Sequence, residues 1–280
     1  MNRFLSGFTA FGLLVALTGP ARSQYTFTPL DVPGAIFTAA SGINDAGQIV
    51  GEYFDDVASH GFLLDVDGSY TPLDVPGATL TIANGISNSG QIVGYYSAGG
   101  RSHGFLRDTD GTYTTFDVTY VRDTFPEGIN NDGQIVGTIG DYIGVSHSFL
   151  RDVDGSYTTA FGPPGETSTD PSGINDRGQI VGVYNAGGRA HGFLRDLDGS
   201  YTTLEGYRPL GINDAGQIVG YYADADGVHG FLRDVDGSYT PLDVPEAQGT
   251  IAYGINGAGQ IVGYYGDADG NVHGFLATPP

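Results

Sequence analysis

Short stretches of alternating apolar and polar residues run along almost the whole chain, and they return in the same order at a regular interval. A ten-residue block, Gly-Ile-Asn-x-x-Gly-Gln-Ile-Val-Gly with Ser for Asn in one copy, begins at positions 42, 85, 128, 173, 211 and 254. Its last four residues are the same in every copy. Copies at a near-constant period indicate one supersecondary unit that is used repeatedly.

Each unit contains four stretches that are typical of β-strands. In the second unit they are residues 81–87, 91–96, 103–107 and 113–118. All are short, rich in β-branched and aromatic residues, and bounded by Gly, Asp, Asn or Pro. Adjacent Ile and Val in the second strand point to opposite faces, so both faces of the sheet must be buried. Apolar residues do not recur at helical spacing, and the sequence therefore predicts an all-β fold.

The two ends of the chain share one unit. Residues 25–35 match segments that elsewhere end a repeat, whereas the last unit stops near residue 276 without such a segment. A four-stranded antiparallel sheet with two apolar faces has to pack between two similar sheets, as the blade of a propeller does. We therefore expect residues 24–280 to form a six-bladed β-propeller, closed by an N-terminal strand (25–32) that completes the last blade (250–277).

The connections between the strands fall into two classes. The turns between the first and second strands (44–47, for example) and between the third and fourth strands (65–68) barely vary among the copies. The second-to-third connections and those that lead to the next unit vary freely. In an up-and-down blade these two classes lie on opposite sides, here called the constant face and the variable face. Function is usually carried by loops on a rigid scaffold, so we expect a site on the variable face.

The first 23 residues are typical of a secretory signal. A short positive start precedes an apolar run at 8–17 that is too short to span a bilayer, and small residues at 21 and 23 fit a cleavage site. Cleavage near Ser23 would release an extracellular or periplasmic protein without a membrane span, which we expect to be a monomer.

Charge and composition exclude several classes of function. The formal net charge is −21, and all eleven basic residues are Arg. An acidic surface repels nucleic acid, so we exclude that partner. The absence of Cys excludes disulfides, thiol catalysis and thiolate metal sites.

The repeat Gly-Ile-Asn-x-x-Gly-Gln-Ile-Val-Gly followed by His-x-Phe resembles that of the bacterial extracellular HAF-type repeat proteins. The resemblance covers nearly all of residues 25–277. This chain has His-Gly-Phe five times and His147-Ser148-Phe149 once, where the family name implies His-Ala-Phe. The resemblance implies export and a β-rich repeat fold, and it supplies no catalytic residues.

Every histidine occupies the same repeat position. Because every unit contains this histidine, we expect it to have the same structural role in each unit. We therefore interpret the set as structural, with each imidazole bonded to backbone near a blade junction. The set comprises His60, His103, His147, His191, His229 and His273.

The Asp-x-Asp-Gly sequences are interpreted as tight turns. They lack the further oxygen ligands and the Glu of a calcium loop. On the variable face, Asp224, Asp226, Asp267 and Asp269 remain weak candidates for calcium, which would make the protein a calcium-dependent adhesion module; no other cofactor is expected.

A catalytic alternative rests on carboxylates and arginines over the channel mouth, which would suit acid–base cleavage of a polysaccharide by a hydrolase or a lyase. The candidates for this role are Glu127, Asp170, Glu166, Arg122 and Arg208, with a solvated acidic rim as the simpler interpretation.

The leading hypothesis is a binding or interaction scaffold for a glycan, a small ligand or an extracellular protein. Aromatic residues that close the second strand, with arginines nearby, would suit such a ligand. The candidates are Tyr96, Tyr222, Tyr265, Arg101, Arg189 and Tyr207, together with Tyr184 and Phe54. Packing between blades is the alternative role for these rings.

Overall fold

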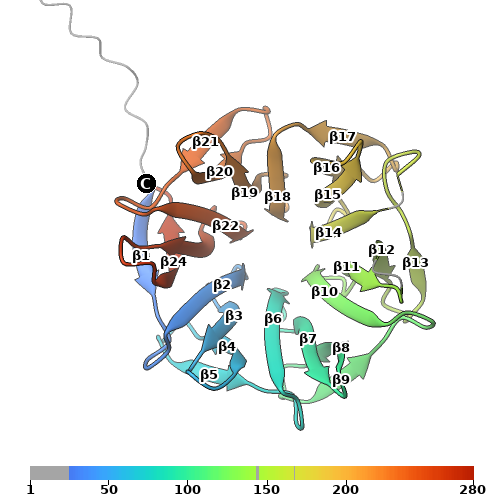
Figure 1. Cartoon of the computed structure of the whole chain (residues 1–280), viewed down its shortest axis with the longest axis horizontal. Helices are drawn as coiled ribbons and strands as arrows, with labels where there is room; N and C mark the ends of the chain where they lie inside the picture. The colour runs from blue at the N-terminus through green and yellow to red at the C-terminus, as the bar shows by residue number, and fades with distance from the viewer. Residues whose placement is uncertain (1–24, 143–144, 167) are drawn as a thin grey trace, which may run out of the picture.

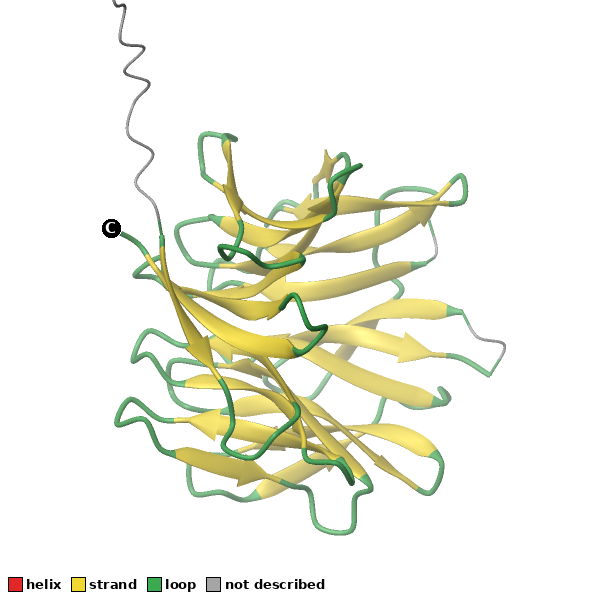
Figure 2. Cartoon of the chain, turned by 60° about the vertical axis from the view of Figure 1, so that its left-hand side comes forward, coloured by secondary structure: helices red, strands yellow, loops and turns green. Residues whose placement is uncertain are grey.

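The computed structural model describes residues 25–142, 145–166 and 168–280, and these contain 24 β-strands and no helix. The predicted signal peptide (1–23) lies outside the described residues. Figure 1 shows the strands arranged around a central axis, and Figure 2 shows loops at both edges of the strands. The described part of the chain has no helix that could span a membrane.

Strands nearest the axis in Figure 1 start each repeat, and the second strand of each repeat lies beside them. The inner strands are β2 (Phe37–Ile43), β6 (Leu80–Ile86), β10 (Asp123–Ile129), β14 (Thr169–Ile174), β18 (Tyr207–Ile212) and β22 (Gly249–Ile255). The second strands are β3 (Ile49–Phe54), β7 (Ile92–Ala98), β11 (Ile135–Gly140), β15 (Ile180–Ala186), β19 (Ile218–Ala223) and β23 (Ile261–Gly266).

The third and fourth strands complete each group of four. The third strands are β4 (Ser59–Leu64), β8 (Arg101–Arg107), β12 (Ser146–Arg151), β16 (Arg189–Arg195), β20 (Val228–Arg233) and β24 (Val272–Thr278). The fourth strands are β5 (Tyr70–Leu73), β9 (Tyr113–Phe116), β13 (Tyr157–Thr159), β17 (Tyr201–Leu204), β21 (Tyr239–Leu242) and β1 (Thr26–Leu30).

Pairing within a group is antiparallel throughout. The first strand of the chain pairs with the last, so that Thr26 lies opposite Thr278 and Leu30 opposite Gly274. Single parallel contacts, Val228 with Gly249 and Val272 with Phe37, also connect neighbouring groups.

The core is repeated in the same way as the strands. The Phe of each His-x-Phe motif is fully buried, at 0% exposure in every group. Clusters of buried residues combine Ile from one group with Val from the second strand of the group before it; Val50, for example, packs with Ile86 and Ile92. Each group thus covers a face of the next, which is why both faces are mostly apolar.

Asn of the Gly-Ile-Asn motif joins neighbouring groups. Its side-chain amide donates to a backbone carbonyl of the next group, from Asn175 to Asn213 at 3.0 Å and from Asn213 to Asn256 at 3.1 Å. The same amide donates to the Gln side chain of its own turn, as from Asn44 to Gln48 at 2.9 Å. These buried contacts explain why Asn and Gln recur in the block.

Candidate functional site

An extra residue in every inner strand projects toward the central axis. Each inner strand shifts register against its partner at one point, between Pro126 and Gly128 in β10, for example. Such a β-bulge leaves one residue unpaired and changes the direction of its side chain. The bulge residues are Ser41, Asn84, Glu127, Ser172, Leu210 and Tyr253. All of them line a single cavity of about 80 Å³ on the axis.

Glu127 is the one acidic residue among these bulge residues. The side-chain amide of Asn84 donates to Glu127 Oε2 at 3.0 Å and to the carbonyl of Pro126 at 2.9 Å. Protein surrounds the carboxyl group, although the side chain still borders the cavity. Burial raises the pKa of Glu127 to about 8, and the negative charge of Asp170 adds to this shift. The Glu127 carboxyl is therefore mostly protonated at neutral pH.

Aromatic rings lie close to the Glu127 carboxyl. Tyr95 on β7 packs edge-to-face against Phe125 of the next group, with ring centroids 5.0 Å apart. Tyr253 and Tyr264 lie 5.8 Å apart in the last group. Burial raises the pKa of Tyr95 to about 12, with further contributions from Glu127 and Glu52. Burial likewise raises the pKa of Tyr253, and the neighbouring Tyr264 and Glu127 add to it.

Glu127 and Tyr253 line the cavity, and three further side chains are close enough to influence the pKa values of these tyrosines or of one another. Glu52, Tyr95 and Tyr264 occupy equivalent positions in the second strands of their groups. Each lies opposite the inner-strand residue that comes two places before the bulge residue of the same group. Burial raises the pKa of Glu52 as well. We call Glu52, Tyr95, Glu127, Tyr253 and Tyr264 the channel site.

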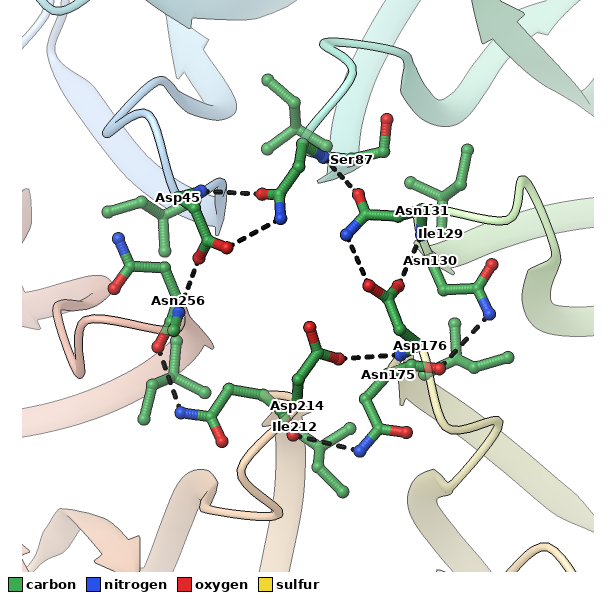
Figure 3. A pocket seen from close by; sticks show the side chains of 17 residues that line it. Asp45, Ser87, Ile129, Asn130, Asn131, Asn175, Asp176, Ile212, Asp214 and Asn256 are labelled. Atoms are coloured by element: carbon green, nitrogen blue, oxygen red, sulfur yellow. Dashed lines mark hydrogen bonds between the residues drawn. The ribbon is translucent and has the colours of Figure 1, made fainter.

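A second cavity, of about 70 Å³, lies on the other side of a ring of isoleucines. The Ile of each Gly-Ile-Asn motif lines both cavities. Figure 3 shows the second cavity, which is lined by Asp45, Asp176 and Asp214 together with asparagines. Their carboxylates already accept hydrogen bonds between groups, for example from the backbone N–H of Gly257 to Asp45 at 2.7 Å. The side chains at this end of the axis thus connect neighbouring groups of strands.

The structure places Glu127 and Asp170 within electrostatic reach of each other. Asp170 lies on β14, where burial raises its pKa and His147 opposes that shift. Its Oδ1 atom is buried and has no hydrogen-bond partner in the described part of the chain. Arg208, on the inner strand β18, lies opposite Tyr221.

Glu166 and Arg122 lie outside the inner strands. Glu166 belongs to a turn in which its N–H donates to the carbonyl of Pro163. Arg122 is exposed, and its guanidinium lies 3.8 Å from the carboxylate of its neighbour Asp123. Two of the five candidate catalytic residues therefore lie in connections.

The tyrosines chosen from the sequence pack against histidines. Tyr96, Tyr222 and Tyr265 stack on the imidazole of the facing third strand, with centroids 5.2 to 5.3 Å apart. Tyr184 does the same, and in the first unit Tyr53, not Phe54, has this role. Successive residues of a strand point to opposite faces, so the preceding residues point away from the histidines: Tyr95 packs on Phe125, and Tyr264 on Tyr253.

The other residues of the predicted binding set are dispersed. Tyr207 stacks on Tyr239 at 4.0 Å and contacts Phe231 within a buried cluster. Arg101 donates to the carbonyls of Val121 and Arg122, and Arg189 is exposed at the start of β16.

Histidines of the repeat bond to carboxylates, which corrects the expected bond to backbone. Nδ1 of His60, His103, His191, His229 and His273 lies 2.8 to 3.1 Å from an Asp or Glu after the fourth strand of the same group. His147 Nε2 lies 3.6 Å from Asp141. Held between a stacked ring and a carboxylate, the imidazole joins three strands of a group.

The weak calcium candidates are engaged in local turns. Asp224 accepts from the N–H of Asp226, and Asp267 accepts from the N–H groups of Asp269 and Asn271. The described residues contain no group of three or more His, Asp or Glu side chains that could hold a metal ion.

Solved structures with a similar fold are β-propeller proteins, so the fold is a β-propeller. Virginiamycin B lyase from Staphylococcus aureus, in a catalytically inactive form with quinupristin, is 13% identical, with a TM-score of 0.52 over 92% of this chain and 100% of that one. A gluconolactonase from Xanthomonas campestris is 14% identical, with a TM-score of 0.55 over 87% of both chains. TolB from Acinetobacter baumannii is 14% identical, with a TM-score of 0.54 over 88% of this chain and 65% of that one. No protein-family model and no curated protein matches the sequence.

Proposed function

We propose that the chain is a six-bladed propeller closed by its first strand, and that it acts as an exported binding scaffold. The pairing of β1 with β24 supports the closure. So does the amide of Asn256, which donates to the carbonyl of Asn44 at 3.1 Å. This contact between the last and first groups repeats the contacts between consecutive groups. Export and membership of the HAF-type repeat proteins rest on the N-terminal sequence and the repeat motif.

The observation that carries the proposed binding function is the variety of the bulge residues. The two positions that follow each bulge residue are Gly and Ile in every unit, whereas the bulge positions hold Ser, Asn, Glu, Leu and Tyr. If the bulge positions served only packing, we would expect similar residues at all of them. We infer that the channel site binds a small ligand or the end of a larger one.

Thermal denaturation of the chain that begins at residue 24 tests this proposal against a panel of glycans, amines and small metabolites. A ligand that binds only the folded state raises the melting temperature by mass action. The expected result is a shift that Tyr253→Leu abolishes. The matched control is Asp214→Asn, which lies at the other end of the axis and should retain the shift. A shift that survives Tyr253→Leu and Tyr95→Leu would place the ligand elsewhere.

A second candidate function is acid–base cleavage. A buried carboxylic acid with a pKa of about 8 beside a second carboxyl group is the pairing that a general acid requires. One structural neighbour is named as a gluconolactonase, so lactones are substrates to try alongside the polysaccharides that the sequence suggested. Turnover that Glu127→Gln and Asp170→Asn each abolish, with the folded structure unchanged, would favour this candidate over simple binding.

A further inference from the structure

A third cavity lies at the outer edge of the first group of strands, away from the axis. Its volume is about 480 Å³, within the range of ~300 to ~1,000 Å³ that is typical of small-molecule pockets. The strands β4 and β5, which line it, lie toward the outside of the molecule in Figure 1. We call this cavity the rim pocket, and its apolar and aromatic lining includes Val32, Ala35, Tyr53, Phe62, Tyr70 and Pro72.

The segment between β1 and β2 forms one wall of the rim pocket. Residues 32–35 of this segment line the cavity, and the N–H of Val32 donates to the hydroxyl oxygen of Thr38 on β2 at 3.2 Å. Another wall consists of the rings of Tyr53, Phe62 and Tyr70, from β3, β4 and β5. Because these three strands pair with one another, the sheet fixes the relative positions of the three rings.

The fifth group of strands shows what fills the equivalent space there. By their places in the strand pairing, Tyr222, Phe231 and Tyr239 correspond to the three rings of the rim pocket. The ring of Tyr207 contacts all three of them. It stacks on Tyr239, with centroids 4.0 Å apart and an interplanar angle of 17°. It packs edge-to-face on Tyr222 at 5.6 Å and on Phe231 at 5.0 Å. A fourth aromatic ring therefore completes this set.

The first group has a smaller residue at the position of Tyr207. Thr38 lies opposite Tyr53 in the same way as Tyr207 lies opposite Tyr222. The connections differ as well, because only residues 205–206 join β17 to β18, whereas residues 31–36 join β1 to β2. The longer connection leaves a cavity between itself and the three rings. The first group thus keeps the three rings and lacks the fourth.

The end of the third strand differs in a way that also leaves the pocket open. In the second group, Arg107 lies opposite Tyr113, and its guanidinium is 6.0 Å from the centroid of that ring. The fifth group has the same contact. In the first group this position is Leu64, opposite Tyr70, and its side chain is buried in the core. The position therefore supplies no guanidinium to cover the ring of Tyr70.

We propose that the rim pocket binds a small aromatic compound, with its ring stacked on Tyr70 as the ring of Tyr207 is stacked on Tyr239. The ligand class follows from what the chain itself places against the same three rings in the fifth group. The volume of about 480 Å³ also exceeds the ~150 Å³ of a cavity that encloses benzene. Asp55 borders the pocket, which favours a ring with a hydroxyl donor over one with an acidic group. The rim pocket is separate from the channel site, so this inference goes beyond the function proposed there.

Ligand-detected NMR titrations with p-cresol, which is the side chain of tyrosine as a free molecule, test the inference. The comparison compound is its saturated analogue, 4-methylcyclohexanol. We expect p-cresol to bind at least ~3-fold more tightly, because only the aromatic ring can stack on Tyr70. Tyr70→Leu should weaken p-cresol binding by at least ~5-fold. The matched control is Tyr113→Leu, the same change where Arg107 lies over the ring, and it should leave the affinity unchanged.

Leu64→Arg provides a second variant should Tyr70→Leu not fold. It introduces the arginine of the second group and should likewise weaken p-cresol binding by covering Tyr70. Equal affinity for the two compounds would overturn the aromatic ligand class, and absence of p-cresol binding would overturn the site.

The channel variant Tyr253→Leu separates this inference from the proposed function. We expect it to retain p-cresol binding. Binding that survives Tyr70→Leu and is lost with Tyr253→Leu would place the compound at the channel site, which would overturn the rim pocket and support the proposed function. If p-cresol binding depends on Tyr70 and no compound of the thermal panel depends on Tyr253, the proposed function fails and the rim pocket stands.

Discussion

Glu127 is a carboxylic acid held inside protein, so its protonation is coupled to folding. Its pKa is raised from 4.5 to about 8 in the folded protein. Between these values the folded state keeps a proton that the unfolded state has released. The free energy of unfolding therefore falls as the pH rises through this window. The difference between the two pKa values is equivalent to roughly 5 kcal/mol.

Glu127→Gln should remove this part of the pH dependence. The variant has no proton to lose, so its stability relative to the unsubstituted protein should increase from pH 5 to pH 9. Denaturant titrations across that range measure the difference. The control is Glu246→Gln, the same chemical change at an exposed position, for which we expect parallel curves. Parallel curves for Glu127→Gln as well would mean that the carboxyl is ionised in the folded protein.

The last residue of Gln-Ile-Val-Gly is glycine for a steric reason. A Cβ atom at Gly94 would lie 2.0 Å from the carbonyl oxygen of Ile82 on the adjoining inner strand, and the other units are equally crowded. Backbone cannot move away as a flexible side chain can.

Gly94→Ala should therefore destabilise the protein by at least ~3 kcal/mol, or prevent soluble expression. Gly266→Ala is the matched control, because a Cβ at Gly266 meets nothing within 4 Å. It should change the free energy of unfolding by no more than ~0.5 kcal/mol. Similar losses in the two variants would show that strand propensity, and not crowding, is responsible.

At the scale of elements, β1 contributes to the last group of strands. It places Phe27 against the buried Phe275, with centroids 5.5 Å apart, and Leu30 opposite Gly274. Without β1 the edge of β24 would be exposed along its whole length.

A chain that begins at residue 35 should melt roughly 10 °C lower or more, since it loses several kcal/mol of apolar burial and a strand pairing. A peptide of residues 24–34 added in trans should restore part of the loss. Removal of Pro279 and Pro280, which follow β24, is the control and should have little effect. An unchanged melting temperature without β1 would contradict the proposed closure.

His273 connects the residue after β1 to the last strand. Nδ1 lies 3.0 Å from Asp31, and Nε2 lies 3.2 Å from Asp267. Burial alone would lower the pKa of His273, but these two carboxylates outweigh it and raise the pKa above 6.5. The imidazolium is thus favoured in the folded state, and its contribution to stability is present below pH 6.5 and is lost as the pH rises through the raised value.

His273→Gln should therefore lower the melting temperature more at pH 5.5 than at pH 8.5. Thermal scans at the two pH values measure the effect, and a double variant with Asp31→Asn should show little additional loss at the lower pH. An equal loss at both pH values would mean that ring packing against Tyr265, and not charge, is what His273 contributes.

For the whole molecule, the large negative charge opposes folding. A net charge of −21 concentrates like charges on a compact surface. Salt screens such repulsion over a Debye length of roughly 30 Å at 0.01 M and roughly 8 Å at 0.15 M.

Raising NaCl from about 0.01 M to about 0.15 M should accordingly raise the melting temperature. An uncharged osmolyte at the same osmolality is the control for effects on water activity. A melting temperature that falls with NaCl would show that attractive ion pairs, such as those of the histidines, outweigh the general repulsion.

Local patterns in the sequence determine most of the β-architecture. The repeat period, the four strands in each unit and the apolar character of both faces follow from the order of side chains, and the structure has strands within a few residues of those predicted. The sequence also indicated that the two ends share a sheet, and β1 does pair with β24. These features are readable because each depends on residues close together in the chain.

The position of the site was decided by tertiary structure. Glu127 and Asp170 could be named from the sequence as carboxylates near the axis. The roles of two neighbouring tyrosines could not be predicted, because strand register turns Tyr95 toward Phe125 of the next group and Tyr96 toward His103. The bulge that directs Glu127 into the cavity arises from strand pairing, and the pKa of about 8 arises from burial by residues distant in the chain. Both depend on contacts that exist only after the strands have packed. The pattern of apolar and polar residues along one strand therefore cannot predict them.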